Sequence, residues 1–260
     1  MAGQLMELGL DGQRALVLGS SSGLGRAVAS SLIAEGAQVA VVSRSAARSE
    51  EAAASLAAAA ALVGDLTVPG DAARLVVDAV AALGGLDICV VNTGGGTPGP
   101  IMSTEGADDG AYHAMLRPVL EVSRAAAPHV CAGGRGRLIY LTARSVVEAT
   151  PELALSSVFR SGVVAAARSL ALELAPNATV NVIVTGQFDT PALGRFERSR
   201  AQHESLSVDE VRRRHIAAIP MGRLGRADEL ADVVTFLASR RAGFVTGTVV
   251  RVDGGAVRGF

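Results

Sequence analysis

The feature of this sequence that most limits its fold is a repeated alternation between short apolar runs and longer stretches rich in Ala and Leu. The short runs contain much Val, which favours strands, whereas the longer stretches have the length and composition of helices. Alternation of this kind is typical of βαβ units, in which parallel strands are buried beneath helices. We therefore predict an α/β fold around one parallel sheet.

The alternation is regular enough for each element to be placed by residue number. The predicted strands are 14–19, 38–43, 61–64, 87–92, 137–142, 179–185 and 248–252. The predicted helices are 25–36, 46–60, 68–84, 108–132, 153–175 and 227–239. Gly, Pro or Asn stands near several helix ends, as helix termination requires. The sequence thus predicts a seven-stranded sheet flanked by helices on both faces.

One segment, 189–225, departs from this alternation. At 260 residues, 49% of them hydrophobic, the chain can bury one large core, and we predict a single domain over 1–260. Within it, 189–225 is polar and rich in Arg, with two weak helical patterns. A long connection after a late strand often covers a ligand, so we predict a substrate lid. Its arginines could attract an anionic substrate such as a coenzyme A ester, or they could be solvated on helix faces.

The overall charge points to a small-molecule ligand. A formal net charge of −1 lacks the basic excess typical of nucleic-acid-binding proteins, so we expect no nucleic-acid partner. The segment 1–14 has no basic stretch followed by an apolar core, and the longest apolar run, 52–63, is too short to span a bilayer. We therefore expect a cytoplasmic protein without a membrane partner.

Two features of composition restrict the chemistry. Cys89 and Cys131 have neither metal-ligand nor redox-motif spacing, so we expect both to be buried apolar residues and predict no metal site. All 24 cationic side chains are Arg, because the chain contains no Lys. A catalytic lysine is therefore excluded.

A glycine-rich loop joins the first predicted strand to the first helix. It runs from Gly19 through three serines to Gly23, Leu24 and Gly25. Glycines at such a turn permit positive φ and let the backbone approach a pyrophosphate, and the helix N-terminus favours its negative charge. Placed at the first strand-to-helix junction of a βαβ series, the loop predicts a dinucleotide site and a Rossmann-type, doubly wound sheet.

The end of the second predicted strand indicates which dinucleotide binds. Enzymes that select NAD usually place a carboxylate against the ribose 2′-hydroxyl at this point. This chain has Ser43 and Arg44 instead, and a hydroxyl and a guanidinium can pair with a 2′-phosphate. Arg48, one turn on, is a second candidate, and Arg44 could also be a surface residue. The pattern favours NADP(H) over NAD(H).

These motifs together resemble the short-chain dehydrogenase/reductase superfamily, in particular bacterial 3-oxoacyl-carrier-protein-reductase-like sequences, over nearly the whole length. The resemblance makes Asp65 an adenine contact, Asn92 and Gly94 part of the turn after the fourth strand, and Thr190 a contact of the nicotinamide carboxamide. The sequence 252–255, Val-Asp-Gly-Gly, is similar to a structural signature of the superfamily. The cofactor-binding residues predicted in this way are Gly19, Ser21, Ser22, Gly23, Leu24, Ser43, Arg44, Asp65, Leu66, Asn92, Gly94, Arg160, Gly186 and Thr190.

The catalytic pattern departs from the resemblance. The superfamily uses a tyrosine as the proton donor, a lysine four residues later, an upstream serine and often an asparagine. Those positions fall here on Ser156, Arg160, Ala143 and Met115. Arg160 can hold ribose hydroxyls or a substrate anion but cannot shuttle protons, and the hydroxyl of Ser156 is a poor acid by itself. The segment 153–156, Leu-Ala-Leu-Ser, resembles an atypical subgroup of the superfamily.

Other side chains could supply the missing donor. Tyr140 points to the same face of its predicted strand as Thr142, although deeper in the sheet, and Thr142 and Ser145 flank the vacant serine position. Further alternatives are carboxyls in the following loop and a histidine in the predicted lid, namely Glu148, Glu152 and His203. Tyr112 and His113 lie early on the predicted helix 108–132, and we expect each of them to have a structural role. The candidate catalytic residues are Ser156, Arg160, Thr142, Ser145 and Tyr140.

Two functional classes follow. One is an NADP(H)-dependent oxidoreductase acting on a carbonyl or alcohol, such as an acyl thioester or ketone, with non-standard proton delivery. The other is a protein of the same fold without redox activity, either an isomerase- or dehydratase-like enzyme or a ligand-binding partner subunit. The resemblance also implies a homo-oligomer, a tetramer or dimer, built on helices 108–132 and 153–175.

Overall fold

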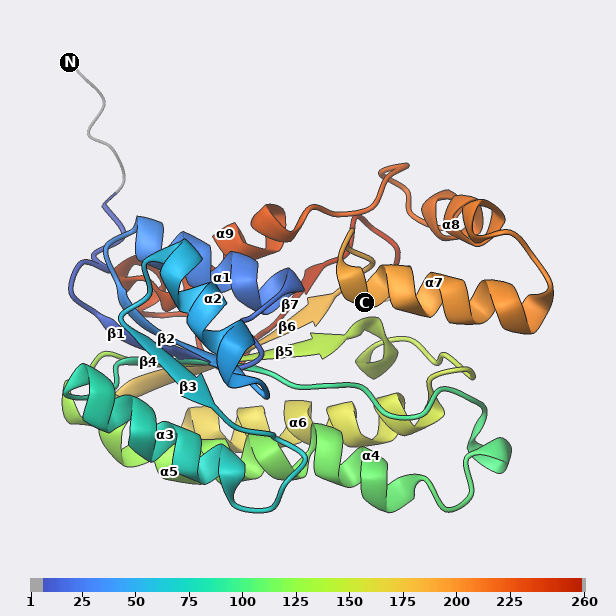
Figure 1. Ribbon diagram of the computed structural model, residues 1–260. Coiled ribbons are helices and arrows are strands. Elements are labelled where there is room, and N and C mark those ends of the chain that lie inside the picture. Colours follow the sequence, from blue (N-terminus) through green and yellow to red (C-terminus); the bar gives the residue numbers. More distant parts are fainter. Residues whose placement is uncertain (1–6, 259–260) are drawn as a thin grey trace.

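A parallel sheet of seven strands forms the centre of residues 7–258, which the computed structural model describes (Figure 1). The strand order is β3-β2-β1-β4-β5-β6-β7, with every neighbouring pair parallel. The strands are β1 (Arg14–Val17), β2 (Gln38–Ser43), β3 (Ala60–Val63), β4 (Ile88–Asn92), β5 (Gly136–Ala143), β6 (Ala178–Thr185) and β7 (Val249–Val252). The predicted doubly wound α/β fold is confirmed. Residues 1–6 lie outside the described residues. They are the start of the segment 1–14, in which we found no basic stretch followed by an apolar core.

Helices cover both faces of the sheet (Figure 1). They are α1 (Gly23–Ala34), α2 (Ala46–Leu56), α3 (Asp71–Leu83), α4 (Asp108–Met115), α5 (Arg117–Ala132), α6 (Ala154–Glu173), α7 (Pro191–Glu204), α8 (Val208–Ala217) and α9 (Ala227–Ala238), with short 3₁₀ turns at Ile101–Ser103, Arg144–Val146 and Arg240–Ala242. Within the described part of the chain, no helix has the length and apolar character needed to cross a membrane.

The two faces of the sheet bury two separate apolar clusters. Alternate residues of β5 divide between them: Leu138 and Tyr140 pack with α3, α5 and α6, whereas Ile139 and Leu141 pack with α1 and α9. All four side chains are buried, as expected for a central strand covered on both sides. This burial fixes the sheet, so the loops at the carboxyl ends of its strands start from rigid positions.

Three of the predicted helices differ clearly from the structure. The predicted helix 46–60 ends at Leu56, because Ala57 adopts φ 54 and Ala60 already belongs to β3. The predicted helix 108–132 is divided at Leu116 into α4 and α5, because Pro118 has no N–H to continue the hydrogen-bond ladder and occupies the first turn of α5. The predicted helix 68–84 begins only at Asp71, because Gly70 before it adopts φ 85 and therefore cannot be helical.

The two weak helical patterns in 189–225 are confirmed as α7 and α8, which pack against each other. A polar network joins them: the buried carboxylate of Glu197 lies 3.2 Å from Nδ1 of His215 and 3.4 Å from Nη1 of Arg212. Arg212 also reaches Asp189 at 2.7 Å. That this unit acts as a lid, within a single domain, remains a prediction.

The cysteine prediction has a mixed outcome. Cys89 is fully buried in β4, and burial raises the pKa of its thiol to about 12. Cys131 is partly exposed near the end of α5. Both thiols are free.

An ion pair closes the amino edge of the sheet, and we expect its loss to destabilise the chain. Asp87 accepts bonds of 2.8 Å from both Nε and Nη2 of Arg14, which hold the pKa of the carboxyl below its usual range. Asp87→Asn is therefore expected to lower the free energy of unfolding by about 1.5–3 kcal/mol at neutral pH. The effect should be present above the unfolded-state pKa of about 3.9 and shrink as the pH falls through the lower folded-state value. Urea denaturation at several pH values measures it.

The matched control is Asp78, whose 2.7 Å pair with Arg74 is exposed on α3. Asp78→Asn should cost less than about 1 kcal/mol, because exposed pairs contribute little. Equal losses in the two variants would contradict the importance given to Asp87.

Candidate active site

The loop between β1 and α1 is shaped by close backbone contact. Gly19 adopts φ 65, and a Cβ on Gly25 would lie only 2.3 Å from the carbonyl oxygen of Gly19. The side-chain amide of Asn92, at the end of β4, donates to the same oxygen at 3.5 Å. Glycine is therefore required at Gly19 by conformation and at Gly25 by space. The fold brings together two of the predicted cofactor motifs, the glycine loop and the turn after β4.

The first turn of α1 can accept an anion. The backbone amides of Gly23 and Leu24 have no hydrogen-bond partner among the described residues, and the side chain of Ser22 does not cap the helix. Ser21 is partly buried and Ser22 is exposed beside them. Free amides at a helix N-terminus, reinforced by the helix dipole, are the donors that a pyrophosphate binds. This part of the site fits a dinucleotide.

The end of β2 carries a cation next to a carboxylate. Ser43 is buried, whereas Arg44 is exposed. The pKa of Asp65 is lowered, first by a hydrogen bond from the Thr67 amide and further by the positive charge of Arg44. Leu66 is held by its carbonyl oxygen, which accepts from the Arg117 guanidinium at 3.1 Å. The predicted contacts for the adenine end thus lie together at the end of β2 and β3.

The start of α7 lies close to the glycine loop. Thr190 is the N-cap of α7, and its hydroxyl accepts from the Leu193 amide at 3.3 Å. A Cβ on Gly23 would lie 3.7 Å from the Cβ of Thr190. Gly186, which follows β6, packs on the backbone of Asp253, where a Cβ would come within 2.5 Å of its Cα. The structure therefore places Thr190 beside the glycine loop and Gly186 against the segment after β7.

A guanidinium from α6 extends across the edge of the sheet to the turn after β4. Arg160 donates from Nη2 to the Gly94 carbonyl oxygen at 2.8 Å and from Nη1 to that of Leu141 at 3.3 Å. Burial lowers the pKa of Arg160 to about 10, so it stays charged at neutral pH. Arg160 thereby brings a fixed positive charge to the loop predicted to hold the cofactor.

Two hydroxyls lie on the same side of the sheet as Arg160. Ser145 Oγ and Ser156 Oγ are 3.2 Å apart, with Ser145 buried in the turn after β5 and Ser156 one turn before Arg160 on α6. A hydroxyl can donate and accept, so this pair can offer one proton to a further acceptor. The structure brings together three of the five candidate catalytic residues.

Tyr140 and Thr142 do not join this pair. Tyr140 is fully buried, its hydroxyl lies 2.7 Å from that of Ser123 on α5, and burial raises its pKa. Thr142 is buried and donates its proton to the Ile183 carbonyl oxygen on β6 at 2.9 Å. Both predictions need correction: the shared strand face was right, but neither side chain has a proton free to reach a substrate.

Comparison with known proteins fits this geometry. The family model described as "Enoyl-(Acyl carrier protein) reductase" matches residues 19–257. The chain is 34% identical to a 4-formylbenzenesulfonate dehydrogenase of Comamonas testosteroni, covering 95% of this chain and 99% of the relative, and 30% identical to a 3-oxoacyl-[acyl-carrier-protein] reductase of Salmonella typhimurium, covering 95% and 98%. The chain belongs to the short-chain dehydrogenase/reductase superfamily.

A solved structure supports the same conclusion for the fold. The L-sorbose reductase from Gluconobacter frateurii, complexed with NADPH and L-sorbose, superposes with a TM-score of 0.91 at 27% identity and covers 98% of this chain and 100% of that one. This chain is thus a short-chain dehydrogenase/reductase by sequence and by fold, and its relatives are oxidoreductases of a superfamily that binds nicotinamide cofactors.

Sequence reasoning overlooked Arg117 in this short-chain dehydrogenase/reductase. Its side chain is buried at the start of α5, donates to the Leu66 carbonyl oxygen, and leaves Nε and Nη1 without a hydrogen bond. Glu121 lies 3.5 Å from Nε and supplies a counter-charge. An Arg directly before a Pro inside an apolar stretch is the signal that could have revealed it.

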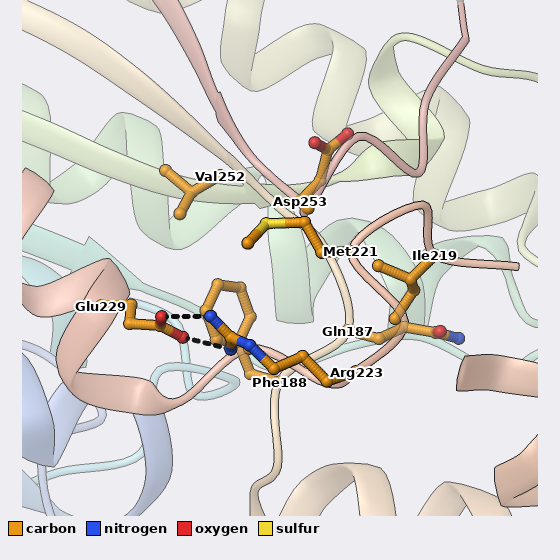
Figure 2. A pocket seen from close by; sticks show the side chains of 10 residues that line it. Gln187, Phe188, Ile219, Met221, Arg223, Glu229, Val252 and Asp253 are labelled. Atoms are coloured by element: carbon orange, nitrogen blue, oxygen red, sulfur yellow. Dashed lines mark hydrogen bonds and ion pairs between the residues drawn. The ribbon is translucent and has the colours of Figure 1, made fainter. Parts of the chain in front are cut away.

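The pocket in Figure 2 lies beside the assembled site, because Gly186 packs on Asp253, one of the residues that line it. It has a volume of about 130 Å³, and none of the predicted site residues lines it. Its walls come from the segments after β6 and β7 and from the turn before α9, where Arg223 pairs with Glu229 at 2.6 Å (Figure 2). That pair, with a further bond from the Arg226 amide, lowers the pKa of Glu229 to about 2.

Proposed function

We propose that the chain is an NADP(H)-dependent oxidoreductase that interconverts a carbonyl and an alcohol without a tyrosine proton donor. The observation that carries the proposal is the position of Arg160: it bonds to Gly94 in the predicted cofactor turn, while its helix carries Ser156, which bonds to Ser145. One side chain therefore links the predicted cofactor site to the hydroxyl pair. Small ketones and acyl thioesters are the substrate classes proposed.

The residues present fit a nicotinamide dinucleotide. The free amides of α1 would hold the pyrophosphate, Ser43 and Arg44 a 2′-phosphate, and Asp65 the adenine end. Thr190 and Arg160 would hold the nicotinamide half. The cofactor supplies the hydride, and the work left to the protein is to orient the substrate and handle one proton.

The proton step follows from the hydroxyl pair. In the direction of reduction, the substrate oxygen accepts a hydrogen bond from Ser145 or Ser156 while negative charge develops on it. The fixed charge of Arg160 stabilises that oxygen, and its pKa of about 10 keeps it from acting as the acid at neutral pH. The proton that completes the alcohol comes from water by way of the hydroxyl pair. The carbonyl group, the hydride from the cofactor and this proton together make up the alcohol product.

A non-redox function is the second candidate, and one observation favours it. Tyr140 is buried in the core and its hydroxyl is bonded to that of Ser123, so it cannot donate a proton beside Ser145 and Ser156. The chain also contains no lysine that could assist a proton donor there. A site that has only hydroxyls and a guanidinium can polarise a substrate oxygen without any hydride transfer. A dehydratase- or isomerase-like enzyme, or a ligand-binding subunit, would need no more than this.

Titration separates the two candidates. NADPH and NADH are titrated by fluorescence, and nicotinamide absorbance is then followed with a panel of 3-oxoacyl thioesters, quinones and cyclic ketones. We expect NADPH to bind more tightly than NADH and to be oxidised by at least one member of the panel. Binding without oxidation throughout would favour the non-redox candidate, and failure of both nucleotides to bind would overturn the proposed site.

We also propose a cytoplasmic homo-oligomer, a tetramer or dimer. The support is an exposed apolar side of α6, where Val158 and Leu172, 55% and 83% exposed, are two heptads apart and so share a face. Burial of these residues against α5 and α6 of a second copy would remove them from water. Light scattering of the purified chain measures the number of copies.

The choice of nucleotide rests on Arg44, and its replacement gives a specific expectation. Arg44→Ala should weaken NADPH binding by about 10- to 100-fold, because a hydrogen bond to a charged group contributes about 1.5–3 kcal/mol. NADH, which lacks the 2′-phosphate, should bind as before. Fluorescence titration of both nucleotides measures the difference.

Arg48, the second candidate for the 2′-phosphate, is also exposed and lies one turn further along, in α2. If Arg44 alone reads the 2′-phosphate, Arg48→Ala leaves both affinities within about twofold of the parent, whereas a selective loss of NADPH affinity in Arg48→Ala would assign the contact to Arg48. A parallel loss of NADPH and NADH affinity in Arg44→Ala would show that Arg44 does not read the 2′-phosphate.

A further inference from the structure

A polar pocket of about 200 Å³ lies at the amino edge of the sheet, opposite the edge that carries the glycine loop. It is lined by the turn before β5, the turn before β6 and the 3₁₀ turn Arg240–Ala242 with the residue after it. None of the residues proposed for the cofactor or substrate belongs to it. The pocket therefore needs an explanation of its own.

Three arginines line this pocket: Arg135, Arg137 and Arg240. None of them forms an ion pair within residues 7–258. Asp87 is near enough for Arg135 to lower its pKa, but its carboxylate is already bonded to Arg14. Three positive charges around one pocket thus lack a dedicated negative partner.

Arg137 is the most constrained of the three, because its side chain is only 5% exposed. It donates to carbonyl oxygens alone, at 3.0 Å to Ser239 from Nη2 and at 2.9 Å to Gly136 from Nη1. Burial, and then repulsion from Arg135, lowers the pKa of Arg137. Neutral carbonyls hold the guanidinium in place, but they do not neutralise its charge.

Thr179 gives an independent observation that points to a ligand. It is the register partner of Arg137 on β6, so both side chains lie on the same face of the sheet. Its residue is 8% exposed and lines the pocket, yet its hydroxyl has no hydrogen-bond partner. Buried hydroxyls are nearly always bonded, so this donor lacks an acceptor.

We infer that this pocket binds a small oxyanion of phosphate type, either inorganic phosphate or the phosphate group of a small monoester. The oxyanion lies among the charges of Arg135, Arg137 and Arg240, and the Thr179 hydroxyl, now buried at the wall of the pocket, becomes its donor once the side chain turns toward it. Arg135 and Arg240 are exposed and can turn toward it, whereas Arg137 is fixed. The bound anion stabilises the folded chain by mass action and does not depend on the nucleotide site.

Binding of inorganic phosphate and of glycerol phosphate tests this inference. Each is titrated at constant ionic strength against chloride, by thermal shift and by calorimetry, with the full chain. We expect saturable binding and a rise in melting temperature that chloride does not give. Tighter binding of glycerol phosphate would identify a monoester as the ligand, and equal or weaker binding would identify inorganic phosphate.

Variants assign the binding to this pocket. Thr179→Val and Arg240→Gln should each weaken phosphate binding by about 10-fold, since each removes a donor to a charged acceptor. Arg124→Gln, which removes an exposed charge from α5, should leave it unchanged. Absence of saturable binding, or unchanged affinity in both pocket variants, would overturn the inference, whatever the outcome for NADPH.

Discussion

Gly25→Ala is expected to weaken NADPH binding by more than about 100-fold, because small displacements of a positioning element are that costly. The new Cβ would lie 2.3 Å from the Gly19 carbonyl oxygen, and backbone atoms cannot turn aside as a flexible side chain can. The first turn of α1 would have to move away from the loop, and its free amides with it. Fluorescence titration measures the loss, and circular dichroism of the variant shows whether the sheet and helices persist.

Gly110 supplies the control for this substitution. It is exposed in α4, without positive φ, and a Cβ there would meet nothing within 4 Å. Gly110→Ala should leave nucleotide affinity unchanged and raise the free energy of unfolding by about 0.5–1 kcal/mol, the usual gain from replacing a helical glycine. If Gly25→Ala bound NADPH as Gly110→Ala does, the glycine loop would not be the pyrophosphate site.

The sheet could be predicted because its signal is local. Each strand is a short apolar run that ends where helical composition begins, and β2 was predicted with its observed bounds, Gln38–Ser43. The division between α4 and α5 was missed because the apolar periodicity continues through the break. Pro118 was the residue that indicated a new helix start there. Helix ends set by one backbone angle, as at Gly70, are weakly encoded in composition.

The site was predictable only as far as strand ends determine it. The carboxyl ends of parallel strands meet at one edge, so Gly19, Asn92 and Arg44 could be grouped before the fold was known. Hydrogen-bond partners were not predictable: alternation placed Tyr140 and Thr142 on one face, with Tyr140 deeper, but could not show that both hydroxyls are already bonded. Their partners, Ser123 and Ile183, are tertiary neighbours that no local pattern identifies.

The hydroxyl pair is the part of the proposed mechanism that most needs testing. Ser145→Ala is expected to lower kcat by about 100- to 1,000-fold with little change in KM, because it removes a donor that acts mainly on the developing oxyanion. Ser156→Ala should have a similar effect, and the double variant should be little worse, because the two hydroxyls act as one unit. NADPH oxidation with a ketone from the panel provides the measurement.

Tyr140→Phe is the matched control for the two serine variants, since it also removes one hydroxyl but from the core. It should leave kcat unchanged and cost about 1 kcal/mol of stability, because Ser123 keeps its bond to the Val119 carbonyl oxygen at 2.6 Å. A fall in kcat confined to Tyr140→Phe would make that tyrosine the donor after all, reached through a movement of α5. Full activity in the double serine variant would leave water alone to supply the proton, with Arg160 as the remaining charged group at the substrate oxygen.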